Sequence, residues 1–261
     1  VAIFENTCPE WMIAAMGAFT QGLIVTTIYA TLGLDAVIDA VNECNVKAIV
    51  CNKANIAILT ERINKMPCLK VIIYTSDAIA PDDKTVIPTA PKGITIVSIE
   101  DFIESGNVKA FPPSPPKPGS CAVIMYTSGS TGKPKGVQLT HGNFLAECGN
   151  VVQGAADLFL KPGGSTLLFL PVAHVFGRMV QIGAITAGLH LAHCSDLTRL
   201  PKDLGSFKPT FVLAVPRIFE KIFNGAEAKA EAAGKGKIFH KAAEVAIAYS
   251  RALDAKSVPP L

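Results

Sequence analysis

A run rich in glycine and hydroxyl side chains is the part of this sequence best suited to chemistry. Residues 126–136 read Tyr-Thr-Ser-Gly-Ser-Thr-Gly-Lys-Pro-Lys-Gly and separate two apolar, strand-like runs, 122–125 and 137–140. Glycine lets backbone N–H groups approach a ligand, and successive N–H groups curled together form an anion site. Hydroxyls add donors, and lysine adds a charge suited to phosphate. The run predicts a loop that binds a triphosphate, through Thr127, Ser128, Gly129, Ser130, Thr131, Gly132 and Lys135.

This loop is not a Walker A loop, which needs a glycine, four residues and then Gly-Lys-Ser/Thr. Here Pro134 follows Lys133, and Thr127 stands where the first glycine would be. The proline also blocks the helix that a Walker loop begins. A solvated Gly/Ser linker is the plain alternative. A linker does not require Lys-Pro-Lys-Gly followed at once by a second strand, so the pattern favours phosphate binding.

The elements that must position this loop are alternating strands and helices. Strand patterns are expected at 1–4, 23–29, 48–51, 71–74, 94–98, 165–170, 189–193 and 210–215. Helical patterns are expected at 9–18, 34–45, 55–63, 99–105, 141–153, 174–187, 197–204, 216–233 and 237–255. Such alternation favours an α/β fold with mainly parallel sheets flanked by helices. The uncharged stretch 11–34 is long enough to span a membrane, but its glycines and threonines favour a buried helix and strand.

The proline-rich segment 111–119 is too rich in proline for a helix or a central strand, and it reads as an extended connector. We expect it to separate a first α/β lobe, residues 1–110, from a second lobe, residues 120–261, which carries the loop. The chain opens inside a strand pattern without an initiator methionine, so we expect a partial sequence.

Composition narrows the class of protein. Hydrophobic residues make up 49% of the chain and charged residues 17%, which predicts a sizeable core. The net charge of +3 comes without a lysine/arginine block, so nucleic acid is not an expected partner. The seven cysteines form no Cys-x-x-Cys pair and the five histidines lack metal-ligand spacing. These features favour reduced thiols in a cytoplasmic setting and no zinc site, and they leave peripheral membrane attachment open.

Other runs keep a fixed order around the loop. They are Val-Ala-Ile-Phe-Glu-Asn (1–6), Pro-Glu-Trp (9–11), Tyr-Ala-Thr-Leu (29–32), Leu-Thr-His (139–141), Phe-Leu-Pro-Val-Ala-His-Val-Phe-Gly-Arg (169–178) and Ala-Val-Pro-Arg-Ile-Phe-Glu-Lys (214–221). Together with the loop, they resemble the AMP-forming, adenylate-forming acyl- and aryl-CoA synthetases, a superfamily that includes luciferases and peptide-synthetase adenylation domains. The segments around His174 and Arg217 are most similar to the long-chain fatty acyl-CoA synthetases. The fold implied is part of the large N-terminal domain of these enzymes, in two lobes and without the small C-terminal domain.

The resemblance implies an ATP-dependent ligase with Mg²⁺ and coenzyme A. A fatty carboxylate would attack the α-phosphate of ATP, and the CoA thiol would then displace AMP from the acyl-adenylate. By motif position Lys135 and His174 are the candidate catalytic residues, and Lys135 is preferred over Lys133. Thr131 is the candidate contact to Mg²⁺. His174, Val175 and Phe176 are the expected acyl-pocket wall, although a core histidine and ordinary core packing are the plain alternatives.

Several alternatives stay open. Arg178 and Arg217 are each either surface residues or structural residues near the acyl tunnel. An aryl-CoA ligase, a luciferase-like enzyme or an amino-acid adenylation domain would share the loop, although the last usually carries an Asp where residues 175–178 have none. A non-catalytic nucleotide-binding fragment is the rival from another class. The family's downstream Tyr-Gly-x-Thr-Glu run, ribose-binding Asp and C-terminal lysine have no counterpart here, so the isolated chain is expected not to turn over.

Overall fold

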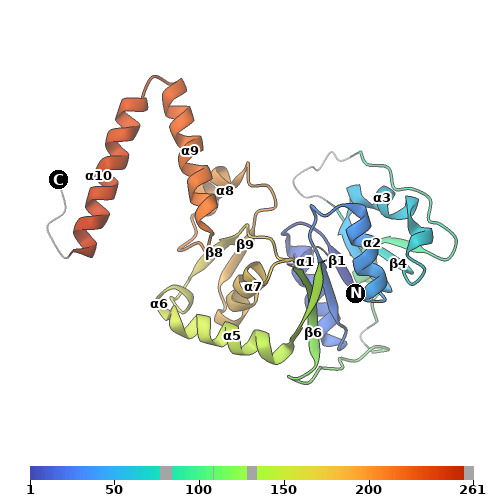
Figure 1. The fold of residues 1–261 in the computed structure, drawn as a ribbon. Coiled ribbons are helices and arrows are strands. Elements are labelled where there is room, and N and C mark those ends of the chain that lie inside the picture. Colours follow the sequence, from blue (N-terminus) through green and yellow to red (C-terminus); the bar gives the residue numbers. More distant parts are fainter. Residues whose placement is uncertain (77–83, 108, 128–133, 256–261) are drawn as a thin grey trace. The chain divides into compact units, whose positions relative to one another are not determined.

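A seven-stranded sheet dominates the computed structural model, which describes residues 1–76, 84–107, 109–127 and 134–255. Its strands lie in the order β5-β4-β3-β1-β2-β6-β7 (Figure 1). They are β1 (Ala2–Phe4), β2 (Val25–Ile28), β3 (Ala48–Asn52), β4 (Val71–Thr75), β5 (Thr95–Ser98), β6 (Cys121–Thr127) and β7 (Lys135–Thr140). The pairs up to β6 are parallel, and β7 pairs antiparallel with β6. This confirms the expected α/β class.

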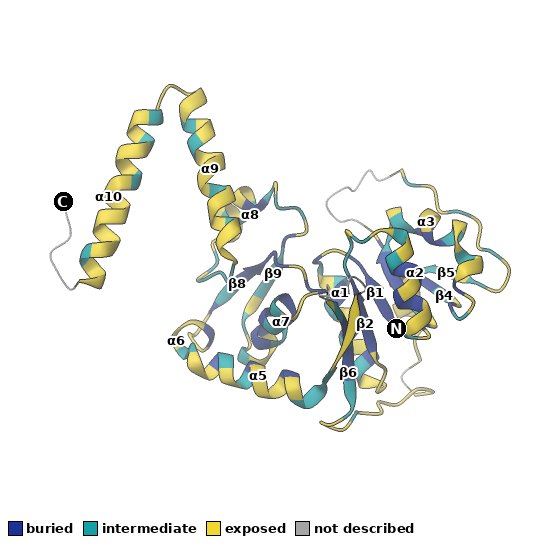
Figure 2. Cartoon of the chain, in the orientation of Figure 1, coloured by how far each residue is buried: buried dark blue, intermediate teal, exposed yellow. Residues whose placement is uncertain are grey.

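Helices cover both faces of this sheet. Ile49 packs with α2 (Leu34–Glu43) and α3 (Ile56–Glu61) in one buried cluster. The next residue, Val50, points to the opposite face because strand side chains alternate. There it borders a cavity shared with α1 (Pro9–Thr20) and α4 (Ile99–Glu104). Residues of the strands are therefore buried from both sides, as their continuous apolar runs predict (Figure 2).

The direction of winding reverses beside β1. The chain leaves β1 for β2 on one side, whereas it leaves β3 for β4 on the other. In open α/β sheets the carboxyl ends of two such strands splay apart and leave a crevice. The residues that follow β1, β3 and β4 therefore meet at one edge of the sheet.

A second, two-stranded parallel sheet joins β8 (Ser165–Leu168) to β9 (His190–His193). The helices around it are α5 (His141–Gly154), α6 (Ala156–Phe159), α7 (Val175–Ala187) and α8 (Leu200–Phe207). Residues 213–261 form a separate compact unit, in which α9 (Pro216–Ala232) and α10 (Gly236–Asp254) are two helices joined by a short turn (Figure 1). Phe223 and Phe239 hold these two helices together, with ring centroids 5.1 Å apart.

Most of the expected elements are confirmed, and two differ. The apolar stretch 210–215 forms a single bridge, between Phe211 and Thr166, instead of a strand. Thr210 bonds the Ser165 carbonyl oxygen at the start of β8 through both its backbone N–H and its hydroxyl, on the edge of β8 opposite β9, but the pairing does not extend beyond the bridge. The helix expected at 197–204 lies at Leu200–Phe207. Residues 11–34 form α1 and β2, and in the described part of the chain each helix is too short or too polar to cross a bilayer.

The division into lobes at 111–119 stays a prediction. The strands β6 and β7, which follow that connector, join the sheet built by the strands before it.

Candidate functional site

The candidate phosphate loop connects two hydrogen-bonded strands. Thr127 ends β6 and Lys135 begins β7, and the two residues face each other in the antiparallel register. Both are exposed. The five candidates Ser128, Gly129, Ser130, Thr131 and Gly132 lie outside the described residues. Of the predicted phosphate contacts, the structure therefore places the two that flank the loop on adjacent strands.

A glycine beside the loop is required by packing. A Cβ on Gly136 would lie 2.9 Å from Cγ2 of Ile124 and 3.6 Å from the ring of Tyr126. At that distance either the Ile124 side chain or β7 must shift to accept a larger residue. Gly136 thus favours the close pairing of β7 with β6 beside Lys135.

His174 is the N-cap residue of α7. Its Nδ1 accepts a hydrogen bond from the backbone N–H of Phe176 across 3.2 Å. When Nδ1 accepts, the proton of the neutral ring sits on Nε2. The side chain is exposed, so Nε2–H is available to donate to a carboxylate or phosphate oxygen. The ring is therefore not part of the core of this chain. The catalytic role of His174 stays a prediction.

Two buried threonines fix the segment that leads to His174. The Thr7 hydroxyl donates to the carbonyl oxygen of Leu170 at 2.8 Å, and the Thr27 hydroxyl donates to that of Ala173 at 3.1 Å. Both bonds are buried, and a buried carbonyl left without a donor costs about 1–3 kcal/mol. These contacts tie residues 170–173 to the carboxyl ends of β1 and β2.

The same contacts relate His174 to the loop. Thr27 aligns with Met125 in the parallel pair β2–β6. Thr127 lies two residues further, about 7 Å along the strand. The segment entering His174 and the start of the loop therefore flank the same end of the sheet. Sequence reasoning named Thr127, Lys135 and His174 but missed Thr7 and Thr27. The available signal was a polar residue inside an apolar strand, which needs a partner when buried.

The two proposed wall residues differ in exposure. Val175 is 45% exposed and Phe176 is half-buried, both in the first turn of α7. They lie beside His174 as the sequence requires. Their role in an acyl pocket stays a prediction.

Arg178, which the sequence left undecided, is fully buried. Its guanidinium lies 4.5 Å from the centroid of the Trp11 ring and hydrogen-bonds Gln181 at 2.5 Å. Its Nε and Nη2 have no hydrogen-bond partner among the described residues, and burial lowers the pKa of Arg178 to about 9. Arg178 is thus an internal anchor between α7 and α1, and nothing in the sequence pairs it with Trp11.

The described residues offer no metal centre. No group of three or more His, Cys, Asp or Glu side chains converges within them. Mg²⁺ is usually held by one or two carboxylates together with substrate phosphates, so its ligands in this protein stay a prediction. Thr131, the predicted Mg²⁺ contact, falls outside the described residues.

The comparisons with known proteins agree with this geometry. A sequence model described as AMP-binding enzyme matches residues 1–257. The chain belongs to this family. The AMP-binding assignment confirms the resemblance drawn from the loop and the runs around it.

Curated relatives in this family are long-chain acyl-CoA synthetases. Long chain acyl-CoA synthetase 7, peroxisomal, of Arabidopsis thaliana is 33% identical over 237 residues, covering 90% of this chain and 33% of that protein. Long-chain-fatty-acid–CoA ligase 5 of Rattus norvegicus is 30% identical over 237 residues, covering 88% of this chain and 34% of that protein. The chain thus spans about a third of the length of these relatives.

Solved structures share the fold of the AMP-binding chain. The adenylation domain of a carboxylate reductase from Mycobacterium chelonae superposes with a TM-score of 0.71 at 21% identity, covering 92% of this chain and 40% of that one. A structure described as a long-chain fatty acid CoA ligase from Rhodopseudomonas palustris superposes with a TM-score of 0.66 at 18% identity. The match covers 85% of this chain and 52% of that one. At these identities the likeness shows the fold alone.

Proposed function

We propose that this chain is part of an ATP-dependent ligase that joins a long-chain fatty acid to coenzyme A. In the first step a carboxylate oxygen attacks the α-phosphorus of ATP and pyrophosphate leaves. In the second, the CoA thiol attacks the acyl carbonyl, loses its proton, and AMP leaves with the bonding electrons. The named activities of the curated relatives support this reaction, and the whole protein would carry it out.

The observation that supports the proposal is that the segment entering His174 and the strand ends Thr127 and Lys135, which flank the loop, lie at one end of the sheet. The acyl-adenylate joins a carboxyl group to a phosphate, so both must be held in one place. His174 Nε2–H would donate to an oxygen of the reacting carboxylate or the α-phosphate. Lys135, the loop hydroxyls and the loop N–H groups would offset charge on the departing pyrophosphate. Catalysis of this kind is positioning and charge stabilisation.

ATP binding by this chain is the first test. We expect replacement of both Thr131 and Lys135 by alanine to abolish ATP affinity measured by calorimetry. Replacement of Lys109 and Lys117, two lysines before β6, serves as the matched control and should leave it unchanged. If the loop variant kept the ATP affinity of the wild type, the proposal that this loop binds the phosphates of ATP would be wrong.

ATP–pyrophosphate exchange in the complete gene product then tests the substrate class. Palmitate should support exchange better than acetate or benzoate. A preference for benzoate or an amino acid would move the protein to another branch of adenylate-forming enzymes. ATP binding without exchange for any acid would indicate a non-catalytic nucleotide-binding protein.

A further inference from the structure

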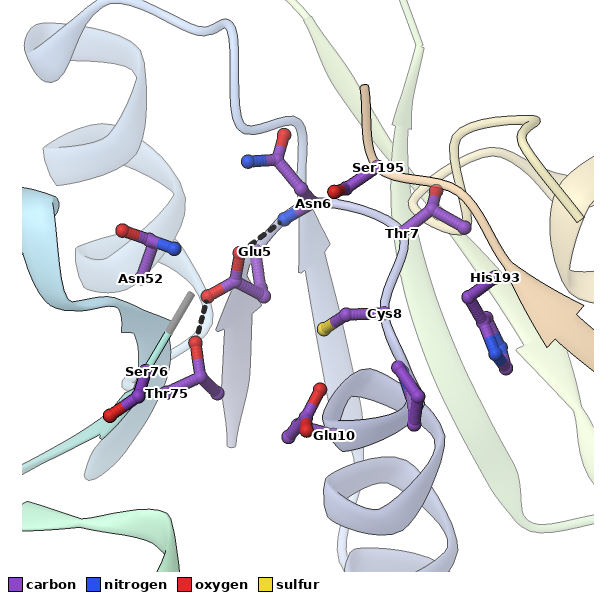
Figure 3. Close-up of a pocket in the computed structure, with 11 residues that line it drawn as sticks. Glu5, Asn6, Thr7, Cys8, Glu10, Asn52, Thr75, Ser76, His193 and Ser195 are labelled. Carbon is purple, nitrogen blue, oxygen red and sulfur yellow. Dashed lines mark hydrogen bonds between the residues drawn. The ribbon is translucent and has the colours of Figure 1, made fainter. Parts of the chain in front are cut away.

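A second cavity lies at the crevice where the winding of the sheet reverses. It measures about 240 Å³ and is lined by residues at or just beyond the carboxyl ends of β1, β3, β4 and β9 (Figure 3). In open α/β folds this crevice is the usual place for a ligand. Thr7, which positions the segment before His174, is one of the lining residues, but the proposed ligase reaction gives no role to Glu5 or to the cavity itself.

Glu5 lies at the centre of the cavity wall. It is only 5% exposed. Its Oε2 accepts from the Thr75 hydroxyl at 2.5 Å, and its Oε1 accepts from the backbone N–H of Asn6 at 2.7 Å. The Asn52 side chain supplies a third hydrogen bond. A carboxylate can accept about four, so at least one acceptor position stays open. Burial nevertheless raises the pKa of Glu5 to about 7, despite these hydrogen bonds. The carboxylate therefore lacks the charge compensation that would keep it fully ionised.

The other charged groups at the cavity do not supply that compensation. None of its described lining residues is a lysine or arginine, and Glu10 adds a second carboxylate. Burial lowers the pKa of His193 to about 4, so its ring is neutral near pH 7. Burial also raises the pKa of the Cys8 thiol, which stays protonated. The cavity thus presents acceptors and negative charge to whatever enters it.

A chain of hydrogen bonds from Arg178 through Gln181 determines which ring nitrogen of His193 carries the proton. Gln181 Oε1 accepts from Arg178 Nη1, so the Gln181 amide nitrogen is the donor that faces His193 Nε2, 3.5 Å away. His193 Nε2 is then an acceptor and Nδ1 carries the proton. The Arg178 guanidinium contacts Gln181 and the Trp11 ring in the interior. It is therefore not a counter-ion for Glu5.

We propose that this cavity binds a small ligand through a positively charged nitrogen, a primary ammonium or guanidinium group, which pairs with the Glu5 carboxylate. A cation supplies the missing charge and N–H donors for the free lone pairs. An anion would meet Glu5 and Glu10. A metal ion would lack a set of three ligands among the described residues.

Calorimetry with charged and neutral probe pairs of equal shape tests this proposal on the full chain. Propylammonium is compared with 1-propanol, and methylguanidinium with N-methylurea. We expect saturable binding of at least one cation and at least tenfold weaker binding of its neutral partner. Binding of propylammonium would indicate a ligand with an ammonium group, and binding of methylguanidinium would indicate one with a guanidinium group.

Two variants assign the binding to Glu5. Glu5→Gln keeps the shape but removes the charge, and it should weaken cation binding at least tenfold. Glu147→Gln removes an exposed carboxylate of α5 and should leave it unchanged. Binding near pH 7 should also release protons from Glu5, seen as a buffer-dependent enthalpy that Glu5→Gln abolishes.

Three results would overturn the proposal: no saturable binding of either cation, equal binding of charged and neutral probes, or cation affinity unchanged in Glu5→Gln. Circular dichroism of the variant confirms that it folds. Because the loop plays no part, this outcome is independent of the ATP and exchange tests.

Discussion

Thr27 and Ala173 are joined by a buried hydrogen bond, hydroxyl to carbonyl oxygen, at 3.1 Å across 146 positions of sequence. Thr27 belongs to the central sheet, and Ala173 immediately precedes His174, the N-cap of α7. Together with the Thr7–Leu170 bond, this hydroxyl positions the segment before the candidate catalytic histidine relative to the end of β6.

Replacing Thr27 by valine removes this hydroxyl while keeping the shape of the side chain. The Ala173 carbonyl is then buried without a donor, so the free energy of unfolding should fall by about 1–3 kcal/mol. Urea unfolding measures the change. Thr186→Val, which removes an exposed helical hydroxyl, should stay within about 0.5 kcal/mol. Equal effects of the two changes would contradict the role of Thr27.

His174→Asn separates the two roles of the histidine. Asparagine is a good N-cap, so α7 and the thermal midpoint should be preserved. The Nε2–H donor is lost, so pyrophosphate exchange in the complete gene product should fall by about 10²-fold or more. His174→Ala should lose the exchange and also about 1 kcal/mol of stability. If His174→Asn kept the full rate of pyrophosphate exchange, His174 would act only as the N-cap of α7.

Gly177→Ala should destabilise the fold near the same segment. A Cβ at Gly177 would collide with the carbonyl oxygen of Pro171, a backbone atom that cannot rotate away. Overpacking of this kind costs about 1–3 kcal/mol. Gly149→Ala, in α5 with nothing within 4 Å of the added Cβ, should instead gain about 0.5–1 kcal/mol. Thermal or urea unfolding of both variants decides the matter.

The raised pKa of Glu5 should make the free energy of unfolding depend on pH. Its pKa rises from the ordinary 4.5 to about 7 in the fold, mainly through burial. Between these values the native state binds more protons than the unfolded chain, so the free energy of unfolding falls as pH rises. The contribution is complete below about pH 4.5 and is lost above about pH 7, a change of about 3 kcal/mol.

The comparison of wild type with Glu5→Gln isolates this effect. His193 acts in the opposite sense, because burial lowers its pKa to about 4 and favours the fold as pH rises. Its contribution is common to both proteins and cancels in the difference. We expect Glu5→Gln to gain stability relative to wild type from pH 5 to pH 8 in urea titrations. Parallel profiles would show that Glu5 is not the titrating group.

Much of the architecture follows from sequence alone. The apolar runs of β1, β3 and β4, separated by amphipathic helices, are enough to predict a parallel, doubly covered sheet, because local periodicity sets these elements. The glycine- and hydroxyl-rich run predicted the loop between β6 and β7, because its chemistry is local. The runs around His174 and Arg217 pointed to the family, which the AMP-binding match confirms.

Only the tertiary structure decided which distant residues meet. The partners of Thr7 and Thr27 lie 163 and 146 positions away, and no local pattern selects a carbonyl at that distance. Arg178 became an anchor for the same reason, since Trp11 reaches it only once α1 and α7 are in place. The cavity at Glu5 depends on the strand order β4-β3-β1, which brings the ends of β1, β3 and β4 together. Sequence determines the elements by short-range preferences, whereas burial against distant partners determines the chemistry of Glu5, His174 and Arg178.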